Sequence, residues 1–256
     1  MNGEDREEQS PPKLLKYFPA PPWNIPPEEI EKRVKEYLSE NPNAPSNLPI
    51  TELVKSIALE RIFEGSCYDD WGHILIDDKH KILKVIDSTW QQAPQKVKEA
   101  LWYWRRAEPV MGGAQVFISK NYDAIHSQYD QVRECLRRNF GDILYLWRGC
   151  GLNASEQHKF TPSSRPPFTS YSASYWIASH FQDPVRLFAV PTDQVIAVLH
   201  GKDDPANANQ AEFIVDTRTQ DYPYIATANE SLDKFLMHFR RINHEWSRKY
   251  ALDHKK

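Results

Sequence analysis

The sequence has few cysteines and no long apolar run. Its 256 residues include three cysteines, Cys67, Cys135 and Cys150, which are too few and too scattered for a disulfide framework. No C-x-x-C or H-E-x-x-H spacing of the kind that holds zinc is present, so we expect no metal. The N-terminus is charged, and no run approaches the ~18 apolar residues of a membrane span. These features favour a protein that acts in the cytoplasm and has no membrane partner.

A strong net charge is lacking as well. The formal net charge is -3, so the overall charge does not indicate binding to nucleic acid or to an anionic membrane. Local charged patches are still possible. A chain of this length can bury a sizeable core. It suits either one large domain or a catalytic domain with a helical extension.

Three regions follow from composition and periodicity. Residues 1–27 are charged and then proline-rich, which predicts an extended arm that docks on the protein itself or on a partner. Residues 28–140 predict a mainly helical region, with one hairpin over 73–86. Helical spacing of apolar residues predicts helices over 28–39, from Thr51 to Gly65, over 95–107 and over 121–140. Residues 141–256 predict several strands and a C-terminal helix that begins after Asn229.

An aromatic and basic cluster ends the third of these helices. Trp102 to Arg106 read W-Y-W-R-R, and such residues can stack nucleobases. They can equally belong to a core helix with a solvated basic end, which is the commoner arrangement of aromatic stripes. Both interpretations stay open.

The stretch over residues 168–181 reads F-T-S-Y-S-A-S-Y-W-I-A-S-H-F. Ser170 and Ser172 lie at the period of a strand, and the apolar residues then switch to helical spacing, so a strand ends here and a helix begins. An S-x-S before a helix is by itself a common capping arrangement. By itself, therefore, this motif indicates only a helix cap, and a functional role needs support from residues elsewhere in the chain.

Two further strands each carry a charged residue at one end. The strand over 144–149 ends in Arg148 and Gly149. A guanidinium there can bind phosphate in a fork geometry, or it can form a surface ion pair. Gly149 allows a ligand to approach the backbone closely, but G-x-G without a third glycine and a following helix is not a dinucleotide fingerprint. We therefore do not expect a doubly wound fold.

The second of these strands covers 210–215 and begins Q-A-E. Its period of two places Gln210 and Glu212 on one face, where both can act on one substrate. The alternative is that Glu212 is an edge-strand glutamate that faces water.

The order of these motifs is arginine, then S-x-S with A-x-x-F, then Q-x-E. It resembles the mono-ADP-ribosyltransferase family of the Arg-Ser-Glu class, over residues 120–227. The resemblance implies an α+β fold, in which a compact antiparallel β core clamps NAD in a cleft. It also implies transfer of ADP-ribose from NAD to a macromolecule, with release of nicotinamide and without a metal.

The resemblance assigns catalytic roles to three residues. Glu212 would stabilise the positive charge that develops on the ribose when the nicotinamide bond breaks, and Ser170 would position that carboxylate and the ribose. Arginine-modifying members usually carry glutamate at the position of Gln210. An amide suits another side chain or the edge of a nucleobase, so we expect a non-arginine acceptor on a protein or a nucleic acid.

The residues expected to bind NAD are Arg148, Gly149, Ser172, Phe181 and Arg186. Phe181 would stack on the nicotinamide, with a core residue as the alternative, and Arg186 would be a second phosphate contact. Tyr171 replaces the threonine usual in the middle of S-T-S, but its side chain points to the opposite face of the strand.

The remaining chain completes the expected core. Strands are predicted over 186–191, 194–199 and 222–227, and the polar loop over 200–209 would face the acceptor. Members of the family are often toxins or effectors, so a neutralising antitoxin or immunity protein is an expected partner. Two rivals remain: an NAD glycohydrolase, in which water replaces the acceptor, and a non-catalytic binding module with the same fold.

Overall fold

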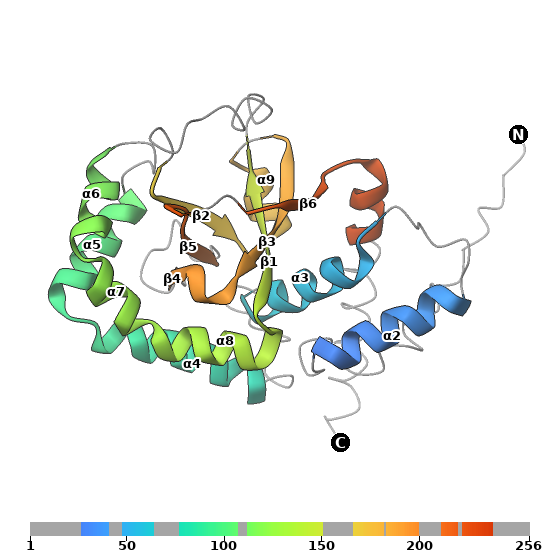
Figure 1. The fold of residues 1–256 in the computed structure, drawn as a ribbon, viewed down its shortest axis with the longest axis horizontal. Coiled ribbons are helices and arrows are strands. Elements are labelled where there is room, and N and C mark those ends of the chain that lie inside the picture. Colours follow the sequence, from blue (N-terminus) through green and yellow to red (C-terminus); the bar gives the residue numbers. More distant parts are fainter. Residues whose placement is uncertain are drawn as a thin grey trace, which may run out of the picture.

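The computed structural model describes eight segments, namely residues 27–40, 48–63, 77–106, 112–150, 166–181, 183–199, 211–219 and 222–237. Within them the chain combines helices with an antiparallel sheet, so the predicted α+β class is confirmed (Figure 1). Almost all of the proline-rich arm, the loop over 200–209 and Gln210 lie outside the described residues. No helix of the described segments is long and apolar enough to cross a membrane.

Seven helices of the described chain precede the first strand. They are α2 (Pro27–Glu40), α3 (Ile50–Phe63), α4 (Asp77–Gln92), α5 (Gln95–Arg106), α6 (Gly112–Lys120), α7 (Tyr122–Gln128) and α8 (Asp130–Phe140). The helices predicted over 28–39, from Thr51 and over 95–107 are confirmed as α2, α3 and α5.

The predicted hairpin over 73–86 is wrong in its second half. Residues 82–86 lie inside α4, where Ile82, Leu83 and Ile86 are buried on one face of the helix. A short apolar run of this kind fits a helix as well as a strand, because its members lie three and four residues apart. Residues 73–76 lie outside the described chain.

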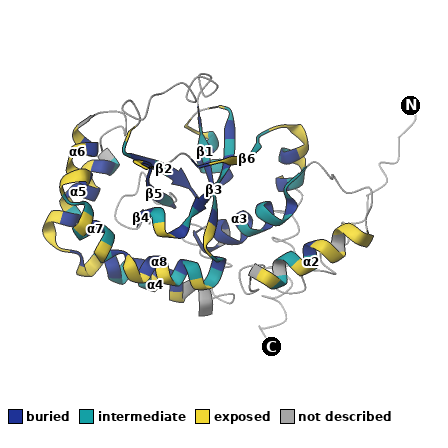
Figure 2. Cartoon of the chain, in the orientation of Figure 1, coloured by how far each residue is buried: buried dark blue, intermediate teal, exposed yellow. Residues whose placement is uncertain are grey.

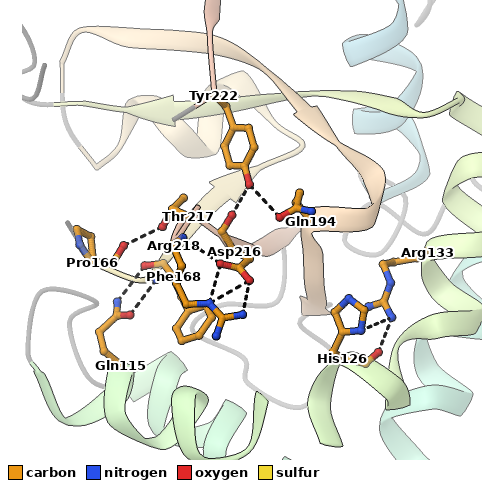
Figure 3. Close-up of polar contacts among 10 residues, drawn as sticks. All are labelled: Gln115, His126, Arg133, Pro166, Phe168, Gln194, Asp216, Thr217, Arg218 and Tyr222. Carbon is orange, nitrogen blue, oxygen red and sulfur yellow. Dashed lines mark hydrogen bonds and ion pairs between the residues drawn. The ribbon is translucent and has the colours of Figure 1, made fainter. Parts of the chain in front are cut away.

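The predicted single helix over 121–140 is divided at Tyr129. α7 ends at Gln128 and α8 begins at Asp130, with Tyr129 between them at φ -96° and ψ 12°. The Arg133 guanidinium donates to the carbonyl of His126 (Figure 3). It also donates to the carbonyl of Val195. The carbonyl of His126, in the last turn of α7, thus accepts both from Arg133 and from the N–H of Tyr129, the latter at 3.2 Å.

Six strands form one sheet, in which every pairing of the described strands is antiparallel. They are β1 (Ile143–Gly149), β2 (Phe168–Ser172), β3 (Val185–Pro191), β4 (Val195–Leu199), β5 (Glu212–Asp216) and β6 (Tyr224–Thr227), in the order β4-β5-β2-β1-β3-β6. The central strands β1 and β2 pair at Trp147 and Ser172, whereas β1 pairs with β3 along its whole length. The sheet thus has two halves that meet at β1 and β2.

Helices cover both faces of the β1–β3 half of the sheet. Alternate residues of β1 point to opposite faces, so Leu144 and Leu146 pack with α4 to α8, whereas Trp147 packs with α2, α3 and the short helix α9 (Tyr175–Ser179). The two groups of helices lie on opposite sides of the strands (Figure 1). Buried residues are concentrated in the strands β1 to β5, whereas β6 has exposed and half-buried residues, and many exposed residues lie on the outer surfaces of the helices (Figure 2).

α3 is apolar around most of its circumference and contributes to both cores. Its first half, with Leu53 and Ile57, packs on the α2 side, and its second half, with Leu59 and Ile62, packs on the α4 side. A helix that is apolar all round is one that neighbours surround. α3 therefore connects the two halves of the hydrophobic interior.

Candidate functional site

Five of the predicted site residues lie on β1, β2 and β5, which are consecutive in the sheet: Arg148, Gly149, Ser170, Ser172 and Glu212. In the β2–β5 pair, Ser172 lies opposite Glu212 and Ser170 lies opposite Ile214. Opposed residues of an antiparallel pair share a face, so Glu212 and both serines share one. The hydroxyl of Ser170 donates a hydrogen bond to Oε1 of Glu212.

Arg148, near the end of β1, contacts the backbone of β2 and the ring of Tyr171, whose side chain lies on the opposite face of β2 from Ser170. Nη1 of Arg148 donates to the backbone carbonyl of Ser170 at 3.4 Å, and its guanidinium carbon lies 5.7 Å from the centre of the Tyr171 ring. Arg148 forms no ion pair with any acidic residue of the described segments, so they give no support to the ion-pair alternative. Arg148 thus contacts the backbone of Ser170, and the side chain of Ser170 contacts Glu212.

A residue of the helical region also contacts this site. Nε1 of Trp104, on α5, donates to Oε1 of Glu212 at 2.8 Å and lies 3.2 Å from Oγ of Ser170. The Trp104 side chain is only 1% exposed and packs in the core, as the second interpretation of the aromatic cluster expected. Its contact with Glu212 was not predicted, because nothing in the spacing of 108 residues signals it. Trp102 and Tyr103, the exposed members of the cluster, pack on each other, and Tyr103 also stacks on Phe117 of α6.

Arg186 lies directly opposite Arg148 in the β1–β3 pair, and Gly149 lies opposite Val185. The guanidinium carbon of Arg186 is 4.4 Å from the centre of the Tyr224 ring, and its buried Nε has no hydrogen-bond partner among the described residues. Neither Arg186 nor Gly149 forms a hydrogen bond to Glu212. The two arginines are therefore neighbours on adjacent strands.

Cys150 lies beside both arginines at the end of β1. Burial raises the pKa of its thiol, although the positive charges of Arg148 and Arg186 act in the opposite direction. The thiolate is the nucleophilic form of cysteine. Cys150 is thus held as a neutral thiol, and it is a poor candidate for a nucleophile.

The helix cap after β2 is Ser174, which the sequence did not single out. Its hydroxyl accepts from the N–H of Ile177 at 3.4 Å and donates to Oε1 of Glu60 at 2.6 Å. Glu60 is a buried residue of α3. The hydroxyl of Ser172 accepts from the N–H of Ser174, so Ser172 also shapes the turn into α9.

Phe181 follows the end of α9 and is 64% exposed. The interpretation of Phe181 as a core residue is therefore wrong, because α9 is too short to carry it back onto the sheet. Its stacking on a ligand stays a prediction. Gln210 lies outside the described residues, and its shared face with Glu212 also stays a prediction.

The far end of β5 carries a separate polar cluster (Figure 3). Arg218 donates to both carboxylate oxygens of Asp216, the closer at 2.6 Å, and stacks over the ring of Tyr122 at 3.9 Å. Burial alone would raise the pKa of Asp216, but hydrogen bonds and charge from Arg218 outweigh it and lower that pKa. Gln115 of α6 binds both backbone groups of Phe168 and so anchors the start of β2.

In comparisons with known proteins, no family model, curated protein or solved structure matches the chain. Within the described segments no three His, Cys, Asp or Glu side chains gather in a way that could hold a metal ion.

Proposed function

We propose that the protein is a mono-ADP-ribosyltransferase, which transfers ADP-ribose from NAD to a non-arginine acceptor on a macromolecule. In this proposal the sheet is an ADP-ribosyltransferase-like core that clamps NAD. The supporting observation is that Arg148 contacts the backbone of Ser170 and that the side chain of Ser170 contacts Glu212. These residues come from three different strands, and the resemblance assigns all three to one site.

Glu212 has the surroundings that the reaction needs. Its Oε1 is held by Ser170 and Trp104, whereas its Oε2 has no hydrogen-bond partner among the described residues. Breaking the nicotinamide bond develops positive charge on the ribose, as in glycoside hydrolysis. A carboxylate that is already oriented can stabilise this charge through a ribose hydroxyl, without reorganisation during the reaction.

The paired arginines suit the pyrophosphate of NAD. Arg148 and Arg186 are directly opposed on neighbouring strands, and two guanidiniums can bind phosphate oxygens in fork geometry. Gly149 adds no side chain beside Arg148, and Ser172 lies opposite Glu212. Phe181 offers an exposed aromatic face for the nicotinamide.

The acceptor follows from Gln210. An amide two residues before Glu212 in the sequence cannot pair with a guanidinium as a second carboxylate can, but it suits a protein side chain or a nucleobase. Such an activity fits a toxin or effector that acts in the cytoplasm, together with a partner that neutralises it.

Nicotinamide release from NAD tests the reaction. Glu212→Gln keeps the size of the side chain and removes its charge, so we expect turnover to fall at least about 100-fold while NAD affinity persists. The matched control is Glu230→Gln, because Glu230 is an exposed glutamate that pairs with Lys234 on the surface. Wild-type protein that binds NAD without releasing nicotinamide would instead indicate a binding module.

Labelled NAD in cell extract tests the acceptor. We expect Gln210→Ala to lose transfer to the macromolecule and to keep slow hydrolysis of NAD. Digestion with protease or nuclease then shows which macromolecule carries the label. Label attached to arginine, or transfer and hydrolysis that fall together, would contradict this role of Gln210. Hydrolysis with no labelled macromolecule would identify an NAD glycohydrolase.

A further inference from the structure

One contact of the site comes from outside the strands. The indole of Trp104 belongs to α5, and its N–H points at Oε1 of Glu212, at 2.8 Å. The rest of the side chain is buried in the core that α4 to α8 share with the sheet. The nitrogen is therefore fixed in place by packing and is not held by the site itself.

The donors and acceptors of this contact can be assigned without ambiguity. An indole N–H only donates, and an ionised carboxylate only accepts. The Ser170 hydroxyl has one proton, which it gives to Oε1 of Glu212, and its oxygen faces the indole N–H at 3.2 Å. Trp104, Ser170 and Glu212 thus form a closed triangle around Oε1.

This triangle constrains the side chain of Glu212, which is the most flexible of the three. A glutamate side chain has several rotatable bonds, and fixing them costs conformational entropy. Ser170 fixes Oε1 from β2 and Trp104 fixes it from α5, so the remaining rotation of the carboxylate is blocked and Oε2 keeps one direction. Sites of this precision need groups whose own positions are locked by packing.

We propose that Trp104 is a positioning residue for Glu212. Helix α5 therefore contributes a functional residue to the site. The indole N–H holds Oε1 so that Oε2 alone faces the substrate. The kinetic consequence of this inference rests on the proposed function. The coupling between the indole and the carboxylate does not.

A donor-free isostere at position 104 measures the N–H alone. Replacing Trp104 by 3-benzothienylalanine keeps the shape of the ring system and exchanges the N–H for sulfur. We expect kcat for nicotinamide release to fall about 10- to 100-fold, the usual worth of a hydrogen bond to a charged group. KM for NAD should stay within about 2-fold, because Trp104 is not expected to touch the substrate.

Trp147 provides the matched control. It is also a fully buried tryptophan, but its Nε1 has no hydrogen-bond partner among the described residues. The same isostere at position 147 therefore loses no bond to Glu212, and kcat should stay near the wild-type value. In a Glu212→Gln background, the isostere at position 104 should have little further effect on kcat, because the two changes remove the same interaction.

A spectroscopic measurement tests the contact between the Trp104 indole and the Glu212 carboxylate without NAD. In protein with ¹⁵N-labelled tryptophan, the indole signal of Trp104 is identified by its loss in Trp104→Phe. We expect Glu212→Gln to shift that signal and Glu230→Gln to leave it in place. An unmoved signal, or wild-type kcat with the isostere at position 104, would overturn the inference. If the wild-type protein releases no nicotinamide, the proposed function fails and the spectrum alone decides the role of Trp104.

Discussion

At the scale of single residues, a substitution of Phe181 should affect ligand binding without affecting stability. Its ring is 64% exposed, so Phe181→Ala should change the free energy of unfolding by no more than about 0.5 kcal/mol. If Phe181 stacks on the nicotinamide, the substitution should raise KM for NAD about 5- to 100-fold, since stacking on an aromatic ring is worth ~1–3 kcal/mol. Thermal unfolding and the concentration dependence of nicotinamide release measure the two effects.

Met237 is the control for this prediction, because it is an apolar side chain that is 61% exposed. Met237→Ala should leave both stability and KM unchanged. A KM that Phe181→Ala leaves at the wild-type value would show that the exposed ring takes no part in binding NAD.

Residues that carry charge or a hydroxyl at strand ends could be predicted from the sequence, whereas their supports could not. Arg148 and Glu212 stand out because a charged side chain lies beside an apolar run, and Ser170 stands out because it recurs with Ser172 at the period of a strand. Trp104 and Glu60 have no such contrast: one is an aromatic residue in a helix, and the other is a helical glutamate. Their roles depend on how α5 and α3 dock against the sheet, which single-chain periodicity does not encode.

At the scale of elements, β5 is fixed at its far end by Asp216 and Arg218. A carboxylate whose folded pKa is depressed contributes stability above its unfolded pKa, which is about 3.9, and loses that contribution as the pH falls through the folded pKa. We expect Asp216→Asn to destabilise the protein by about 1–3 kcal/mol at pH 7. The difference from wild type should shrink below about pH 4.

Urea unfolding at pH 7 and at pH 3 measures this difference directly. Other titrating acids, such as Glu31 with its pKa lowered by the hydrogen bond from Lys55, are present in both proteins and cancel in the comparison. A gap between mutant and wild type that stays constant over this range would contradict the ionic role of Asp216.

The helices and strands could be predicted where the apolar residues keep one period along the whole segment. The helix α5 and the strands β1 to β6 lie where the periodicity expects them. The prediction was wrong at residues 82–86, where a short apolar run allows either structure, and at Tyr129, where Arg133 binds a carbonyl of the preceding turn. Both errors arise where tertiary contacts decide between local conformations that the sequence leaves nearly equal.

At the scale of the whole molecule, the helices and the strands share one core. Leu144 and Leu146 of β1 and Val190 of β3 pack in the same cluster as Val132 and Leu136 of α8. Each large apolar side chain that loses such cover costs about 1.5–3 kcal/mol. A few of these losses equal the entire net stability of about 5–15 kcal/mol that is typical of a domain.

The fragment over residues 141–256 should therefore not fold alone, although it contains Arg148, Ser170 and Glu212. We expect it to show no cooperative thermal transition and no nicotinamide release, because its strands would expose the surface that α4 to α8 cover and its Glu212 would lack Trp104. Co-expression with residues 1–140 as a separate chain should restore both properties, since the missing contacts are non-covalent and the cut lies beside Gly141, between α8 and β1. Circular dichroism melts of the fragment, the reassembled pair and the intact chain make the comparison. A fragment that melts cooperatively on its own would show that the helical region is a separate domain and that the site is complete without it.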